Sequence, residues 1–150
     1  MRSSSERCAR YLIVRMVNLL EELGSVALDS SVLIKHFRGS ATMREKLDAC
    51  AQLYLSTTAL GELYAGAYVL ENPRREFRKI NSILPLMHVV GDSPLTAHVY
   101  GHVYAQLRRS GTLIPQNDIW IAASALLAGL PLATCDHHFT YVTGLTVLLW

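Results

Sequence analysis

The chain has 150 residues, of which 51% are hydrophobic and 17% charged, and its formal net charge is +2. These values exclude a disordered or fibrous chain and are typical of one globular domain with a sizeable core. The mild positive charge permits a nucleic-acid partner but does not indicate one by itself. Three widely spaced cysteines without a CxxC pair favour neither a disulfide framework nor a thiolate zinc site, and they are typical of a reducing, cytoplasmic setting.

Residues 1–25 are predicted to be an N-terminal extension, with a polar start and then an amphipathic helix near 16–23. The alternative is a start assigned too far upstream, with the true start at Met16. The apolar run over 11–20 contains Arg15 and is too short and too charged to cross a bilayer, so no membrane association is expected.

Short apolar runs alternate with helical patterns along the rest of the chain. Strands are predicted over 26–28, 53–56, 87–90, 131–134 and 146–149, and helices over 32–38, 42–51, 58–70, 74–84, 95–109 and 119–128. Glycine and proline stand where most of these helices should stop. The alternation predicts an α/β fold: one three-layer α/β/α domain over 26–150, with a central, mostly parallel five-stranded sheet.

Four acids are embedded in apolar surroundings. Asp29 and Asp136 each follow a predicted strand, and each has the ordinary alternative of capping a helix. Asp118 opens a predicted helix, where an acid also favours the positive helix end. Glu62 is harder to explain structurally, because Ala59 stands where a capping box needs Ser or Thr. A buried acid is costly unless it is paired or binds a metal.

In a parallel sheet, the four acids can all reach the edge at which the strands end. Clustered carboxylates repel one another, and a divalent cation relieves that repulsion. Their hard oxygen atoms suit Mg²⁺ or Mn²⁺. A cation held in this way commonly serves phosphoryl chemistry.

Four segments that contain these acids resemble motifs of the PIN-domain family, and within it of the small VapC-type toxins of bacterial toxin–antitoxin pairs. The segments are LDSSVLI at 28–34, LGELYAGA at 60–67, PQNDIWIAA at 115–123 and LATCDHHF at 132–139. They occur in the family's order, and the resemblance covers about 26–150. Ser31 and Cys135 stand where many members of the family carry Asn.

The resemblance implies a PIN-like fold and a Mg²⁺- or Mn²⁺-dependent endoribonuclease that hydrolyses RNA phosphodiester bonds, with tRNA among the candidate substrates. It maps the catalytic, metal-binding quartet of the family onto Asp29, Glu62, Asp118 and Asp136, with Asp29 and Asp118 as the firmest ligands. It also implies a cognate VapB-like antitoxin that blocks the site, and a homodimer or higher assembly.

Polar residues beside the acids have two interpretations: they orient the carboxylates, or they serve as ordinary turn and cap residues. These residues are Ser30, Ser31, Asn117 and Thr134. Asn117 is predicted to cap the helix that follows it and also to shape the site. Lys35 and Arg38, one helical turn apart and close to Asp29, are the predicted substrate contacts.

Other functions remain open from the residues alone. A catalytically silent PIN-like scaffold that acts through protein contacts is the main alternative. A haloacid-dehalogenase-like phosphatase is disfavoured, because it needs a second Asp at the position of Ser31. His137 and His138 follow the last acid, and they are interpreted as turn residues with proton transfer as the alternative.

Overall fold

The structure, a computed structural model, describes residues 24–150, so the predicted helix over 16–23 lies outside the described residues. Five strands alternate with helices along the described chain. In order these are β1 (Ser25–Leu28), α2 (Ser30–Phe37), α3 (Ala41–Asp48), β2 (Gln52–Ser56), α4 (Thr57–Tyr68), α5 (Pro73–Ile83), the 3₁₀ helix η1 (Leu84–Leu86), β3 (Met87–Val90), α6 (Pro94–Ser110), α7 (Gln116–Ala128), β4 (Leu132–Thr134), the 3₁₀ helix η2 (His137–Tyr141) and β5 (Val147–Leu149).

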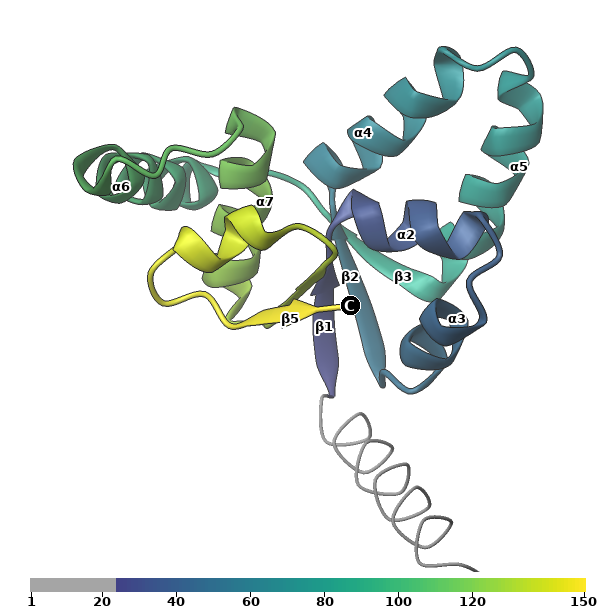
Figure 1. The fold of residues 1–150 in the computed structure, drawn as a ribbon, viewed down its shortest axis with the longest axis horizontal. Coiled ribbons are helices and arrows are strands. Elements are labelled where there is room, and N and C mark those ends of the chain that lie inside the picture. The colour runs from purple at the N-terminus through teal and green to yellow at the C-terminus, as the bar shows by residue number, and fades with distance from the viewer. Residues whose placement is uncertain (1–23) are drawn as a thin grey trace, which may run out of the picture.

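The strands form one sheet in the order β3-β2-β1-β4-β5, and all four pairings are parallel. Figure 1 shows β1 at the centre of the sheet, with helices on either side. Each predicted strand is present, and its ends lie within one residue of the prediction. The predicted α/β architecture and parallel sheet are therefore confirmed.

Helices cover both faces of the sheet. Neighbouring side chains of a strand point to opposite faces. Tyr54 of β2 lies with Ile121 and Ala125 of α7, whereas Leu53 lies with residues of α2 and α3. The molecule is thus a three-layer sandwich. None of the helices in residues 24–150 is long and apolar enough to cross a membrane.

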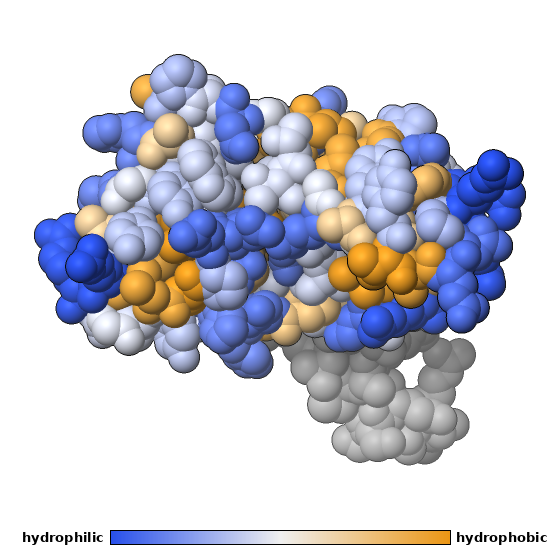
Figure 2. Space-filling view, turned by 90° about the horizontal axis from the view of Figure 1, so that it is seen from above, coloured by the Kyte–Doolittle hydropathy of each residue, from blue (hydrophilic) through white to orange (hydrophobic). Residues whose placement is uncertain are grey.

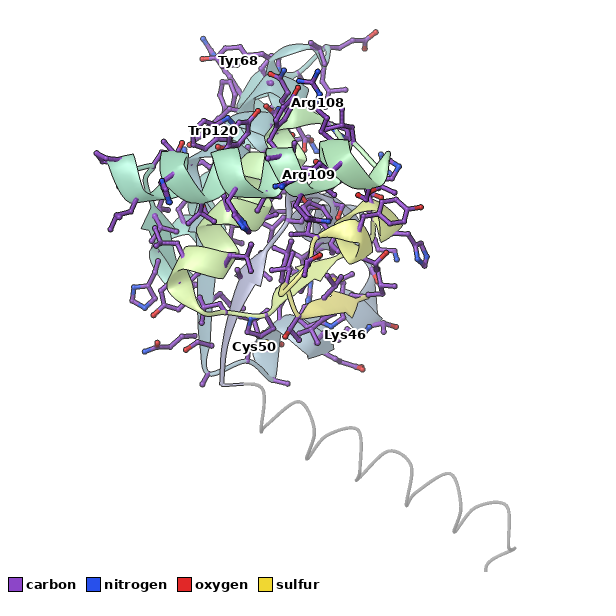
Figure 3. All side chains as sticks on the ribbon, turned by 90° about the vertical axis from the view of Figure 1, so that its left-hand side faces the viewer. Lys46, Cys50, Tyr68, Arg108, Arg109 and Trp120 are labelled. Carbon is purple, nitrogen blue, oxygen red and sulfur yellow. The ribbon has the colours of Figure 1, made fainter. Side chains whose placement is uncertain are left out.

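Helix α6 supports α7 from the outside, and Figure 3 shows it lying across the side of the molecule that faces the viewer. The rings of Tyr100 on α6 and Trp120 on α7 stack with centroids 4.3 Å apart. Val103 and Leu107 of α6 are also buried, and α6 packs against α7. This packing fixes α7, whose first turn carries Asp118.

The carboxyl ends of β1 and β2 point upward in Figure 1. Seen from above in Figure 2, this end of the molecule carries hydrophilic residues across its middle, with separate hydrophobic patches beside them. Four of the buried polar residues also lie at strand ends on this edge: Asp29, Ser30, Ser56 and Thr134. Burial of polar groups is costly, so their concentration at one edge marks it as a candidate site.

Candidate active site

The parallel topology brings the four predicted acids to one edge. Asp29 directly follows β1 and Asp136 follows the adjacent strand β4, while Glu62 lies on α4, which leaves the end of β2. Asp118 lies in the first turn of α7. Open α/β sheets place ligands at this carboxyl edge.

Asp29 is the most buried of the four, with only 4% of its surface exposed. Its carboxylate caps α2 and accepts hydrogen bonds from the Ser31 amide at 3.4 Å, from the Ser31 hydroxyl, and from Thr134 Oγ1 at 2.9 Å. These three bonds all reach Oδ2. Burial raises the pKa of Asp29, and the hydrogen bonds oppose that rise. The capping and site interpretations of Asp29 are therefore compatible.

Glu62 is half-buried and is held at both carboxylate oxygens. Ser30 Oγ donates to Oε2 at 2.6 Å, and Asn117 Nδ2 donates to Oε1 at 3.0 Å. These two donors come from α2 and α7, so Glu62 links three helices at the site. A carboxylate fixed in this way has a defined orientation before any ligand binds.

Asp118 lies close enough to the other three acids to be affected by their negative charges. The pKa of Asp118 is raised to about 6, mainly by burial and then by the negative charges of Asp29, Asp136 and Glu62, in that order. The positive charge of His138 opposes this rise. All four predicted acids are therefore close enough to interact electrostatically, as charge crowding in a cluster requires.

Asp118, Asp136 and a histidine form one group of possible metal ligands in the site. Ligand atoms of Asp118, Asp136 and His138 lie within 4.8 Å of one another, and in the part of the chain that the structure describes this is the one group of three or more such side chains. Asp136 Oδ1 accepts the His138 amide at 2.8 Å and lies 3.3 Å from His138 Nδ1. The sequence prediction of His138 as a turn residue was incomplete, because the turn itself folds the ring toward the acids.

The polar residues predicted beside the acids contact them. Thr134 Oγ1 donates to Asp29 and accepts the Asp136 amide at 3.0 Å, so one buried hydroxyl connects two of the acids. The Ser31 hydroxyl accepts the amide of Cys135 at 3.0 Å. The predicted capping role of Asn117 is wrong: Pro115 is the N-cap of α7, no side chain caps this helix, and Asn117 donates to Glu62 instead.

The two predicted substrate contacts differ in their surroundings. Lys35 is exposed, and its ammonium donates to the carbonyl oxygen of the C-terminal residue Trp150 at 3.4 Å. Arg38 is exposed at the end of α2 and lies on the rim of a neighbouring cavity. Lys35 lies in the last turn of α2, and Arg38 is the C-cap of the same helix.

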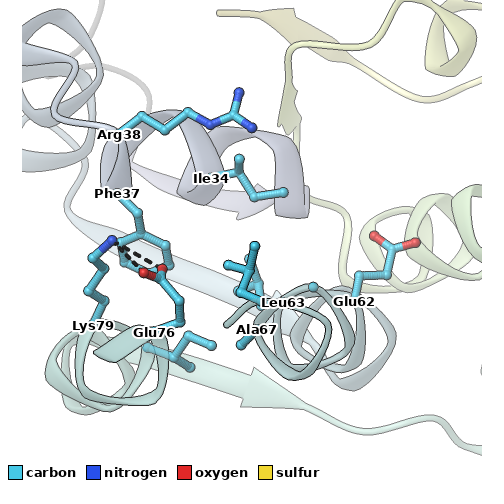
Figure 4. Close-up of a pocket in the computed structure, with 11 residues that line it drawn as sticks. Ile34, Phe37, Arg38, Glu62, Leu63, Ala67, Glu76 and Lys79 are labelled. Atoms are coloured by element: carbon cyan, nitrogen blue, oxygen red, sulfur yellow. Dashed lines mark hydrogen bonds and ion pairs between the residues drawn. The ribbon is translucent and has the colours of Figure 1, made fainter. Parts of the chain in front are cut away.

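That cavity adjoins the acids. It has a volume of about 250 Å³ and lies among α2, α4 and α5. Figure 4 shows Ile34, Phe37, Leu63 and Ala67 lining it, with the Glu76–Lys79 ion pair at 2.9 Å on one side. Glu62 lines the cavity and also belongs to the acidic site, and its carboxylate points away from the labelled apolar residues in Figure 4. The cavity and the acidic site are therefore neighbours.

Comparison with known proteins agrees with this geometry. The PIN domain family matches residues 26–145. The chain belongs to the PIN-domain family. Among its PIN relatives, Ribonuclease VapC2 of Haemophilus influenzae is 35% identical over 100 residues, which is 66% of this chain and 76% of that protein.

Solved structures share the fold over most of this chain. A chain of VapBC2 from Rickettsia felis, in a crystal structure bound to a DNA fragment from their promoter, has a TM-score of 0.79 and 19% identity, covering 84% of this chain and 98% of that one. A chain of FitAcB from Neisseria gonorrhoeae has a TM-score of 0.74 and 26% identity, covering 82% of this chain and 96% of that one.

Proposed function

We propose that this chain is a Mg²⁺- or Mn²⁺-dependent endoribonuclease toxin of the VapC type, which hydrolyses RNA phosphodiester bonds in the cytoplasm and is neutralised by a cognate VapB-like antitoxin. The observation that carries the proposal is the convergence of four acids at the carboxyl edge of a PIN-domain sheet. The ribonuclease activity named for its VapC relatives supports it.

The donor set at this edge fits a hard divalent cation. Carboxylate oxygens are the ligands that Mg²⁺ and Mn²⁺ prefer. The raised pKa of Asp118 reflects burial and crowding of negative charge that a cation would relieve. Asp118 and Asp136 would hold the ion together with Asp29, and Glu62 completes the acidic quartet. When bound, the ion would polarise the scissile phosphate and neutralise charge that develops on it.

The chain's own residues then orient the reactants. Glu62 is fixed by Ser30 and Asn117, which suits it to align the attacking water. Asp29 is fixed by Ser31 and Thr134 and keeps one edge of the site rigid. RNA phosphates passing along α2 would meet the positive charges of Lys35 and Arg38 on exposed positions of that helix.

The cavity beside the acids suits a segment of the antitoxin. Its apolar walls would take hydrophobic side chains, and an occupant that reaches Glu62 would block the site. Leu70→Asp, at an exposed position that lines the cavity, should weaken copurification with the antitoxin at least about tenfold. The matched control is Leu127→Asp on α7, which is 44% exposed and lies outside the cavity.

A homodimer or higher assembly is also expected for the chain. Light scattering of the purified protein, alone and with antitoxin, measures the mass of each assembly directly. A monomer over a wide concentration range would contradict this expectation without affecting the proposed chemistry.

The test of the proposed activity is cleavage of total RNA and of a tRNA pool by antitoxin-free chain, in EDTA, Mg²⁺ or Mn²⁺. We expect cleavage that needs the metal and falls by at least about 10²-fold in Asp29→Asn and Asp118→Asn. The matched control is Asp48→Asn, the same chemical change at an exposed residue at the end of α3.

Two results would overturn the proposal. Full activity in EDTA, or in Asp118→Asn, would remove the metal-dependent mechanism. Absence of cleavage by a folded, antitoxin-free chain with every RNA in the pool would favour the alternative of a silent scaffold that acts through protein contacts.

A further inference from the structure

The 3₁₀ helix η2 brings a nitrogen donor to the acidic site. Asp136 is the N-cap of η2, and its Oδ1 accepts the backbone N–H of His138 at 2.8 Å. This short turn directs the His138 ring back toward the cap, where Nδ1 lies 3.3 Å from the same Oδ1. With Asp118, these side chains form a three-residue group whose ligand atoms all lie within 4.8 Å.

An ordinary ion pair accounts poorly for this arrangement. The side chains of His138 and Asp136 are 52% and 41% exposed, and exposed ion pairs contribute little to stability. The ring also faces a second acid, Asp118, from another part of the fold. The adjacent His137 is exposed and does not belong to the group, so position on η2 alone does not explain the convergence.

The spacing fits coordination of one ion. Neighbouring ligands of an octahedral cation with bonds of about 2.1 Å lie roughly 3 Å apart. The 3.3 Å between His138 Nδ1 and Asp136 Oδ1 is close to that value. An imidazole nitrogen is neutral when it binds, so it adds a ligand without adding to the repulsion among the carboxylates.

We propose that His138 is a nitrogen ligand of the divalent cation, together with Asp118 and Asp136, and that it shifts the preference of this site from Mg²⁺ toward Mn²⁺. Mg²⁺ favours oxygen ligands and retained waters, whereas imidazole nitrogen suits transition-metal ions. This inference rests on the proposed function, because it assumes that the acids bind a cation. It adds a residue and a metal preference to that function.

The test measures binding of Mn²⁺ and of Mg²⁺ to the full-length, antitoxin-free chain by calorimetry, with free Mn²⁺ followed by electron paramagnetic resonance. We expect His138→Ala to weaken Mn²⁺ about tenfold and Mg²⁺ by no more than about twofold. His137→Ala is the matched control and should change neither affinity. Thermal unfolding of each variant checks that it is folded.

Pulsed paramagnetic resonance tests directly whether the His138 nitrogen binds the metal. In chain labelled with ¹⁵N-histidine, pulsed paramagnetic resonance of bound Mn²⁺ should show a directly coordinated nitrogen. That coupling should persist in His137→Ala and disappear in His138→Ala.

The possible outcomes separate the two proposals. Mn²⁺ binding without a nitrogen coupling, or with affinities that His138→Ala leaves unchanged, would overturn the role of His138 while leaving a metal-dependent nuclease intact. Equal losses of Mg²⁺ and Mn²⁺ affinity in folded His138→Ala would overturn the metal preference. Failure of the wild-type chain to bind either ion would instead remove the metal basis of the proposed function.

Discussion

The end of β1 and the start of α7 each present an aspartate to the same site, but they hold it differently. Asp29, at the end of β1, is 4% exposed, and three hydrogen bonds reach its Oδ2. Asp118, in the first turn of α7, is half-buried, and the hydrogen bonds among residues 24–150 include none to its side chain.

The difference separates an acid that the protein holds rigidly from an acid whose charge is crowded by its neighbours. Burial raises the pKa of both acids, but for Asp29 the hydroxyls of Ser31 and Thr134 stabilise the charged form. For Asp118 the neighbouring acids add to the cost of ionisation. The protein itself therefore stabilises the charge on Asp29, whereas burial and the neighbouring acids oppose the charge on Asp118.

The largest difference between these regions should appear when each acid is truncated. We expect Asp29→Ala to lower the free energy of unfolding of the metal-free protein by about 2–4 kcal/mol, because α2 loses its cap and the hydroxyls of Ser31 and of the buried Thr134 lose their acceptor. Asp118→Ala should be neutral or stabilising. Urea unfolding in EDTA measures both, and Asp29→Asn is the control that preserves size. Equal losses in the two Ala variants would contradict the comparison.

A smaller effect should follow from removing one support of Asp29. Thr134→Val keeps the shape of a fully buried side chain but removes the hydroxyl that contacts Asp29 and the Asp136 amide. We expect a loss of about 1–2 kcal/mol in unfolding free energy, measured by urea titration. Thr42→Val, at an exposed position of α3, is the matched control and should stay within about 0.5 kcal/mol of wild type. A loss no larger than that of the control would show that this hydroxyl does not support the site.

Asp118 should make the free energy of unfolding depend on pH. Its folded pKa of about 6 exceeds its ordinary value of 3.8, so between these values the folded state holds more protons than the unfolded state. The contribution of Asp118 to stability in EDTA should therefore fall as pH rises from about 4 to 6 and then stay low.

Asp118→Asn should remove this contribution and be more stable than wild type at pH 7. Solvent screens the charge of this half-buried group, so we expect the variant's free energy of unfolding to exceed that of wild type by about 1 kcal/mol. This corresponds to roughly 2–4 °C in Tm. Melting curves from pH 4 to 7.5 in EDTA give both profiles. A variant whose profile matches wild type would show that charge crowding at Asp118 is weak.

Much of this organisation could be predicted from the sequence, because it depends on patterns along the chain. Apolar runs bounded by glycine and proline gave each strand to within one residue. An acid directly after a buried strand must emerge at the carboxyl edge, which located Asp29 and Asp136. Glu62 was identified because its surroundings offered no ordinary structural role for a charge.

Two features of the site depend on local geometry that the sequence pattern does not contain. The approach of His138 to Asp118 requires the tight turn of η2 and the packing of α7, which are distant in sequence. The start of α7 depends on Pro115, whose extended backbone makes it the N-cap. Asn117 is therefore the second residue of the helix. A polar residue at that position was mistaken for the cap because Asn is a favoured capping residue.

The smallest predicted effect tests that corrected position. Asn117→Ala should change the free energy of unfolding by no more than about 0.5 kcal/mol, because Asn117 is exposed and its side chain does not cap α7. Ser93→Ala is the control for a real cap: Ser93 caps α6 with a capping box, and its loss should cost about 1 kcal/mol. Urea unfolding compares the two variants directly. If Asn117→Ala cost as much as Ser93→Ala, the prediction would be wrong, and either Asn117 would cap α7 or its hydrogen bond to Glu62 would stabilise the fold by about 1 kcal/mol.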